Sequence, residues 1–176
     1  MKKQHNSRGI KNFDNWLSPS KHEVYTLAEI INIIRENMDC EIHVGTDSHL
    51  KRGDSSKHVF ASVVCIQKKG RGAFYYYMQE DVSSHSMTLH DRIMEEASRS
   101  ISIVEKIRMS LISRRITVHS DTNTNSMYPT KKFTDIIQKW VTSMGVNFLA
   151  KPDAWASTCV ADMHSKPERR FTSPLN

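Results

Sequence analysis

The sequence predicts one α/β domain with a mixed five-stranded sheet flanked by helices. Two observations lead to this fold class. Three strand-like runs rich in β-branched and aromatic residues follow one another with no helical pattern between them, which favours an antiparallel meander. Helical and strand patterns then alternate, which favours strands added in parallel. A chain of 176 residues is the usual length of one domain and needs neither disulfides nor a structural zinc to bury a core.

The first part of the chain is expected to hold a basic arm and a helix. Residues 1–21 show no periodicity and are predicted to be an arm beside the domain. Thr26 and Glu29 have the spacing of a capping box, in which each side chain bonds the other's backbone N–H. Apolar residues then recur at helical spacing, so a helix is predicted over residues 27–37.

The antiparallel meander is expected to follow. A short strand at residues 42–44 runs into a polar turn at residues 45–48. Residues 50–56 form a polar linker, and strands are predicted over residues 58–66 and 73–78. A Gly-containing hairpin joins the last two strands.

Helices and strands alternate in the second half. Helices are predicted over residues 88–111 and 131–144, the second ended by Gly145 as a C-cap. Strands are predicted over residues 115–119 and 146–150.

A last helix is expected over residues 153–165, with Asp153 as its cap. Residues 22–166 would then form the folded domain, and residues 167–176 a flexible basic tail.

Composition favours a reducing compartment and a polyanionic partner. The chain has 25 Lys and Arg against 19 Asp and Glu, a net charge of +6, and basic residues gather near both ends. Nucleic acid is such a partner, and the alternative is that the charge only keeps the protein in solution. The cysteines are odd in number, lack a CxxC pair and are expected to be small core residues: Cys40, Cys65 and Cys159. Because no apolar run fits a membrane span or a signal peptide, we expect a cytoplasmic protein with no membrane partner.

Two aspartates follow predicted strands. Asp47 and Asp121 each stand where a hydrophobic run gives way to small polar residues. An Asp in such a place can simply form a turn. Two aspartates on neighbouring strands would also suit a two-metal hydrolytic site, since such a site draws three or four carboxylates from different elements.

The long predicted helix carries two adjacent acids, which helical geometry separates. Each residue advances about 100°, so Glu96 shares the apolar face of Ile93 and Ser100, whereas Glu95 shares the face of Arg92 and Arg99 and should point into water. A carboxylate on an apolar face is costly unless it is paired or bound to metal. Glu96 is therefore the expected ligand, and the alternative is that it only borders this face.

The last predicted helix offers a fourth acid. Asp162 lies on the side of Trp155 and Cys159 and is expected to face the interior as a metal ligand. His164, two residues later, could transfer a proton near the metals, and the simpler alternative is a surface position. No HExxH or paired CxxC spacing exists, so a zinc site is not expected.

Three motifs together resemble a known family. They are the run from Gly45 to Ser48, the run from Arg92 to Glu96, and the run from Lys151 to Ala156 (KPDAWA) with Asp162 six residues later. They resemble the YkuK-like family of the RNase H-like superfamily, over about residues 26–166. The order Asp, Glu, Asp, Asp is likewise similar to the general plan of that superfamily.

The resemblance implies an RNase H-like sheet and a metal-dependent nuclease. Such a hydrolase cleaves phosphodiester bonds of RNA, DNA or hybrids with two Mg²⁺ or Mn²⁺ ions held by four carboxylates: Asp47, Glu96, Asp121 and Asp162. The chain lacks the separate basic insertion that grips a hybrid duplex, so specificity for hybrids is not implied. The alternative is a non-catalytic nucleic-acid-binding protein with this fold. Actin-like ATPases are built from two such domains, and this chain has the length of one.

Overall fold

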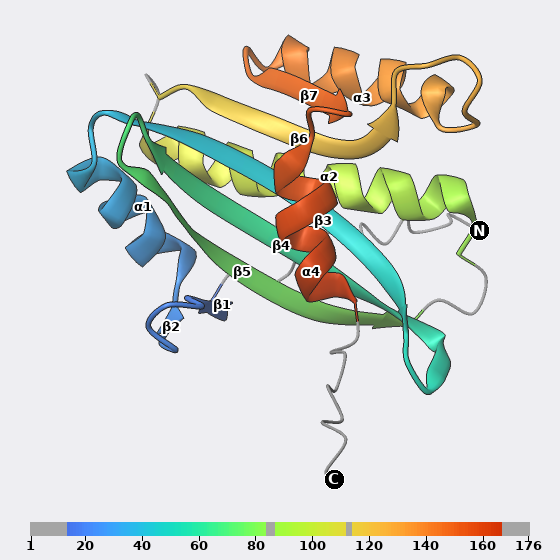
Figure 1. Ribbon diagram of the computed structural model, residues 1–176, viewed down its shortest axis with the longest axis horizontal. Helices are drawn as coiled ribbons and strands as arrows, with labels where there is room; N and C mark the ends of the chain where they lie inside the picture. Colours follow the sequence, from blue (N-terminus) through green and yellow to red (C-terminus); the bar gives the residue numbers. More distant parts are fainter. Residues whose placement is uncertain (1–13, 84–86, 112–113, 167–176) are drawn as a thin grey trace, which may run out of the picture.

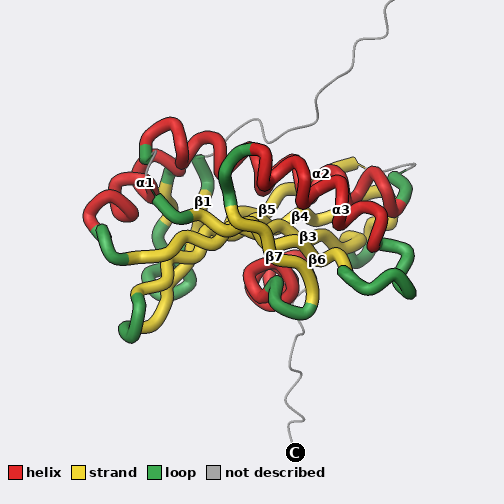
Figure 2. Tube along the Cα trace, turned by 90° about the horizontal axis from the view of Figure 1, so that it is seen from above, coloured by secondary structure: helices red, strands yellow, loops and turns green. Residues whose placement is uncertain are grey.

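The computed structural model describes residues 14–83, 87–111 and 114–166, and it shows a twisted sheet with helices on both faces (Figures 1 and 2). The strands β3 (Cys40–Lys51), β4 (Asp54–Lys68) and β5 (Gly72–Ser83) form an antiparallel meander. β6 (Ile116–Asn123) joins β3 in parallel, and β7 (Asn147–Lys151) joins β6 in parallel. The mixed α/β class predicted from the sequence is confirmed.

The sheet has seven strands, in the order β2-β1-β5-β4-β3-β6-β7, and the prediction of five is therefore wrong. The additional strands are β1 (Trp16–Leu17) and β2 (Val24–Tyr25), which pair with each other at the β5 edge. β1 lies in the segment predicted to be a basic arm beside the domain, and Trp16 is fully buried. Strands of two residues are too short to show an alternating pattern, so periodicity could not reveal them.

The meander is also longer than predicted. The supposed polar linker at residues 50–56 is the end of a hairpin, in which Lys51 pairs with Asp54 across a turn. Gly53 takes a positive φ of 80° in this turn, a conformation that glycine adopts without steric cost. The polar residues near the turn become strand because their backbone groups pair across the hairpin.

Three helices cover one face of the sheet: α1 (Leu27–Glu36), α2 (Leu89–Ser110) and α3 (Lys131–Ser143) (Figure 2). Their predicted positions are confirmed to within one or two residues. The capping box of Thr26 and Glu29 is present. Gly145 has a positive φ of 67° directly after α3, as expected of a residue that ends a helix.

The opposite face carries one helical segment, which does not begin as an α-helix. It consists of a π-helix, η1 (Ala156–Ala161), continued by the short helix α4 (Asp162–Ser165). The prediction of one regular helix from residue 153 is wrong. The N-cap of η1 is Trp155 and has no side-chain capping bond, and Asp153 is exposed. A π-helix advances by fewer degrees per residue than an α-helix, so the predicted phase does not carry through η1.

The core has two parts, one on each side of the sheet. The larger cluster packs the sheet against the layer of α1, α2 and α3. A smaller one packs Val63 and Cys65 of β4 against Ala156 and Ala161 of η1. Cys40 and Cys65 are buried as predicted, whereas Cys159 is exposed. Side chains from both layers can therefore reach the sheet between them.

Candidate metal centre

Asp47 and Asp121 lie where two parallel strands separate. β3 and β6 pair from Ile42 and Ile116 as far as Gly45 and His119. Each aspartate comes two residues after the last pair, so the two acids occupy matching positions on either side of the opening. The pairing of β6 with β7 shifts between residues 120 and 123, and such bulges often re-aim side chains beside active sites.

Asp47 is held almost entirely away from water. It is 4% exposed, and its Oδ2 accepts a hydrogen bond of 2.6 Å from the Ser165 hydroxyl. Burial raises the pKa of the Asp47 carboxyl, and the charges of Asp121 and Asp162 raise it further. The carboxylates of Asp121 and Asp162 therefore lie near enough to Asp47 for their charges to act on it.

Glu96 reaches the same opening from the helical layer. As the helix geometry predicted, it points from α2 toward the sheet, and its Oε1 accepts a hydrogen bond of 2.6 Å from the Ser48 hydroxyl. Burial, followed by the charge of Asp47, raises the pKa of Glu96 to about 8. One turn further along, Ser100 donates to the Thr46 hydroxyl at 2.9 Å, which fixes α2 against β3.

Asp121 faces a cation from the neighbouring strand. Its Oδ1 lies 2.5 Å from Nζ of Lys151 at the end of β7. The pair does not have hydrogen-bond geometry, since this buried oxygen has no hydrogen-bond partner. The contact is an ion pair between two opposite charges.

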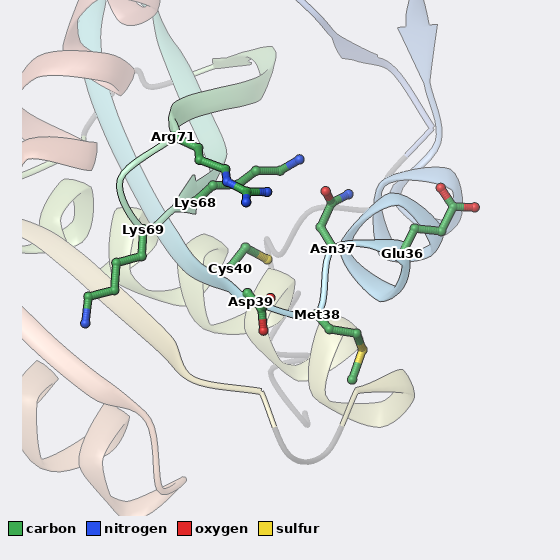
Figure 3. A pocket seen from close by; sticks show the side chains of 8 residues that line it. All are labelled: Glu36, Asn37, Met38, Asp39, Cys40, Lys68, Lys69 and Arg71. Carbon is green, nitrogen blue, oxygen red and sulfur yellow. The ribbon is translucent and has the colours of Figure 1, made fainter.

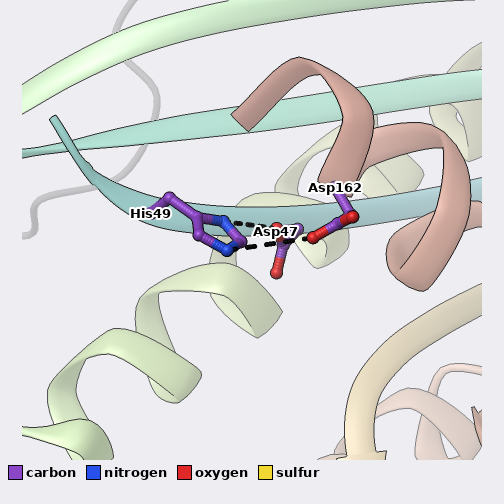
Figure 4. Close-up of side chains that lie close together, drawn as sticks. All are labelled: Asp47, His49 and Asp162. Carbon is purple, nitrogen blue, oxygen red and sulfur yellow. Dashed lines mark ion pairs between the residues drawn. The ribbon is translucent and has the colours of Figure 1, made fainter. Parts of the chain in front are cut away.

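Asp162 completes the set from the other face of the sheet, at the first position of α4. It is held by His49, whose Nε2 lies 3.8 Å from Asp162 Oδ1 while its Nδ1 lies 3.1 Å from Asp47 Oδ2 (Figure 4). On its other side, Nζ of Lys166 is 2.5 Å from Asp162 Oδ2. The expectation that Asp162 shares a buried side with Cys159 is wrong, because Cys159 is exposed.

Sequence reasoning missed His49. The signal was available, because residues two apart on a strand share a face and His49 comes two residues after Asp47. What the sequence could not show is that the imidazole reaches Asp162, more than a hundred residues away. Ser165 Oγ also lies 2.8 Å from His49 Nδ1, so α4 is fixed to this end of β3 by two side chains.

His164 lies beside the centre and turns toward β5. Its ring stacks on Tyr77 with the centroids 3.6 Å apart, and its Nε2 is 3.0 Å from the Tyr75 hydroxyl. Burial lowers the pKa of His164, which favours the neutral imidazole. Its role in proton transfer stays a prediction, and among the described residues His49 is the imidazole that contacts the carboxylates.

A buried pair of histidines joins η1 to the two strands that form the opening. The Ala156 N–H points to His119 Nδ1 at 3.4 Å, and His119 Nε2 lies 3.0 Å from His43 Nδ1. Because His119 accepts at Nδ1, its proton must be on Nε2 and is donated to His43. Burial lowers the pKa of His119 to about 3, so the pair is neutral and serves to position the strands and η1.

The donor set fits divalent cations. Carboxylate oxygens are the ligands preferred by Mg²⁺ and Mn²⁺, and an imidazole is tolerated by Mn²⁺ and later transition metals. One ligand atom from each of Asp47, His49 and Asp162 lies within 4.8 Å of the others, somewhat wider than the roughly 3–4 Å between ligands that each lie about 2.1 Å from one Mg²⁺. Glu96 and Asp121 could contribute further oxygens from across the opening.

A hollow of the described surface lies away from these acids. It has a volume of about 310 Å³ and sits where α1, the start of β3 and the β4–β5 hairpin meet (Figure 3). Cys40 of β3 lines it, seven residues before Asp47, which corresponds to roughly 20 Å along a strand. Its side chains carry charges of both signs: Glu36, Asn37, Met38, Asp39, Cys40, Lys68, Lys69 and Arg71. It therefore has no part in the centre.

Comparison with known proteins agrees with the fold. Residues 25–166 match the sequence model of the ribonuclease H-like family. The chain belongs to this family. The ribonuclease H-like match begins at β2 and ends at α4, so it contains every element that contributes an acid to the centre. No curated protein and no solved structure matches the chain. Across the described residues, no helix is long and apolar enough to cross a membrane.

Proposed function

We propose that this ribonuclease H-like protein is a metal-dependent nuclease that hydrolyses phosphodiester bonds of RNA or DNA. The observation that carries the proposal is the burial of two carboxylates, Asp47 and Glu96, on either side of one strand. Within the described part of the chain, neither forms an ion pair with a lysine or an arginine. Buried carboxylates are costly unless they are neutralised, and divalent cations shared with Asp121 and Asp162 would neutralise them.

Each residue of the centre has a task in this proposal. The ligands are Asp47, Glu96, Asp121 and Asp162, with His49 beside the first and last of them. Two bound Mg²⁺ or Mn²⁺ ions would supply a nucleophilic water at neutral pH and stabilise the leaving 3′ oxygen. The Ser48 and Ser165 hydroxyls hold the Glu96 and Asp47 carboxylates in place, because each donates its proton to one carboxylate oxygen.

Within the family, the motifs support a YkuK-like protein. The KPDAWA run provides Lys151, which faces Asp121, and begins the segment that leads through η1 to Asp162. The run from Gly45 to Ser48 provides the first ligand and the hydroxyl that fixes Glu96. The two motifs, which are about a hundred residues apart in the sequence, would thus both contribute to the proposed centre.

The test is a cleavage assay on single-stranded RNA, single-stranded DNA, duplexes and hybrids, with Mg²⁺, Mn²⁺ or EDTA. We expect cleavage that needs the metal and that falls to background in Asp47→Asn, which keeps the size of the side chain and removes its charge. Thermal unfolding must show that the variant is folded. If the folded variant cleaves like the wild type, the proposed mechanism is wrong. If the wild type binds these substrates without cleaving any of them, the chain is a nucleic-acid-binding protein instead.

A further inference from the structure

Two lysines neutralise the solvent-facing half of the centre. Lys151 pairs with Asp121 and Lys166 pairs with Asp162, each at 2.5 Å. The lysine side chains are 42% and 52% exposed, and those of their aspartates are 30% and 25% exposed. Asp47 and Glu96, in contrast, are buried. The two lysines therefore lie on the more exposed side of the centre.

The lysines of these two ion pairs can readily exchange their carboxylates for other anions. Exposed pairs contribute little stability, because water and salt screen the two charges. A divalent cation that takes up the charge of Asp121 or Asp162 removes most of the attraction for the lysine and repels it. A lysine is a compact charge on a flexible stem and binds phosphate readily. Released lysines at the edge of this centre would meet the phosphates of a bound strand.

We propose that Lys151 and Lys166 are counter-ions of the metal-free centre that exchange their carboxylates for nucleic-acid phosphates when divalent cations bind. This inference rests on the proposed function. It predicts two effects of opposite sign for the removal of either lysine: the metal should bind more tightly when nucleic acid is absent, and nucleic acid should bind more weakly when metal is present. A lysine that only stabilised the fold would produce neither effect.

The first experiment measures Mn²⁺ affinity without nucleic acid, by electron paramagnetic resonance of free Mn²⁺, for Lys151→Gln and Lys166→Gln. Each variant should bind Mn²⁺ about two- to fivefold more tightly than the wild type, the range expected when one exposed competing charge is removed. The chain offers matched controls. Lys51 of β3 pairs with Asp81 of β5, and Lys131 pairs with Asp135 one helical turn away. Lys51→Gln and Lys131→Gln should keep the wild-type affinity.

The second experiment measures binding of a single-stranded oligonucleotide by fluorescence anisotropy at several salt concentrations, with Ca²⁺ or with EDTA. A gel checks that the oligonucleotide stays intact. Each phosphate contact contributes about 0.7 to the salt slope for a single strand. Adding Ca²⁺ should therefore steepen the wild-type slope by up to about 1.4 relative to EDTA. Lys151→Gln and Lys166→Gln should each remove about half of this increase, and the two controls should keep it.

The outcomes separate this inference from the proposed function. If the wild type binds no Mn²⁺, the metal centre itself is wrong. If the wild type binds Mn²⁺ and the two variants bind it with the affinity of the controls, the centre stands and the counter-ion exchange is overturned. If the variants bind Mn²⁺ more tightly while the salt slope in Ca²⁺ matches that of the controls, the lysines are counter-ions that do not contact phosphate, and the exchange is again overturned.

Discussion

Adjacent acids on α2 have different surroundings, which the helix geometry predicted only in part. Glu96 points to the opening between β3 and β6, as expected. Glu95 pairs with Arg99 at 2.9 Å, but it does not point into water, since only 12% of its side chain is exposed. Arg99 is buried, also pairs with Glu80 at 2.6 Å and lies 4.6 Å above the Phe60 ring. We therefore expect the two glutamates to have separable roles, Glu96 in the proposed centre and Glu95 in stability.

The same substitution at both positions tests this division. Glu96→Gln should abolish metal-dependent cleavage, because the amide cannot neutralise a cation. Glu95→Gln should leave most of the cleavage but lower the free energy of unfolding by about 1–3 kcal/mol, because a buried guanidinium is deprived of one charged partner. Cleavage rates and urea unfolding of both variants provide the measurement. An inactive, folded Glu95→Gln beside an active Glu96→Gln would reverse the assignment of the ligand.

The high pKa of Glu96 predicts how the stability of the metal-free protein depends on pH. Burial and the nearby Asp47 charge raise the pKa of Glu96 from 4.5 to about 8. Between these values the folded protein keeps a proton that the unfolded chain has released. The free energy of unfolding in EDTA should therefore fall as the pH rises from about 4.5 to about 8, by up to about 1.4 kcal/mol per pH unit from this group.

Urea unfolding at several pH values checks this expectation. Glu96→Gln should flatten the decline, and saturating Mn²⁺ should oppose it in the wild type, because metal binds the folded state and prefers ionised carboxylates. The same slope for the variant and the wild type in EDTA would mean that Glu96 does not hold the proton.

At the scale of elements, the placement of Asp162 depends on how closely η1 approaches β3. A Cβ on Gly45 would lie 2.7 Å from the backbone nitrogen of Ser157 and 2.9 Å from the carbonyl carbon of Ala156. Both atoms belong to the backbone and cannot rotate away. The absence of a side chain at Gly45 therefore lets η1 rest directly on the strand and brings Asp162 to Asp47.

Gly45→Ala should move η1 away from the sheet. We expect it to destabilise the protein by about 1–3 kcal/mol, as overpacking commonly does, and to weaken Mn²⁺ binding because Asp162 moves with the helix. Asp162→Asn is the reference, since it should weaken Mn²⁺ binding without the loss of stability. Thermal unfolding and Mn²⁺ titration measure both effects. Wild-type Mn²⁺ affinity in Gly45→Ala would show that η1 does not position the ligand.

How far the sequence could predict these elements depends on the range of the interactions that form them. The capping box of Thr26 and the apolar stripes of α1, α2 and α3 are local, and their helices were predicted within one or two residues. The π-helix η1 forms against Gly45, which is distant in sequence, and no local pattern indicates it. For the same reason the four acids could be chosen from strand ends and helix faces, whereas the contacts of His49 and Lys151 with those acids required the structure.

At the scale of the whole molecule, the basic residues near the N-terminus lie directly before residues that belong to the folded domain. The basic residues of this region precede the described part of the chain: Lys2, Lys3, Arg8 and Lys11. Trp16 follows them closely and is fully buried. Leu17 pairs with Tyr77 of β5. Trp16 and Leu17 therefore belong to the folded domain, and we propose that the binding arm predicted over residues 1–21 ends before Trp16.

Two truncations place this boundary. Deleting residues 1–13 should weaken nucleic-acid binding without changing the melting temperature, and it should lower the salt slope by about 0.7–0.9 for each phosphate that the arm binds. Deleting residues 1–18 should have the same effect on binding and should also destabilise the protein by about 3–5 kcal/mol, the usual cost of removing a buried aromatic side chain. Anisotropy titrations at several salt concentrations and thermal unfolding give both quantities.

A full-length variant with Gln at all four basic positions separates charge from length, because it should bind like the shorter deletion. If that variant keeps the wild-type salt slope, the arm makes no phosphate contacts, and nucleic-acid binding must depend on the folded domain alone.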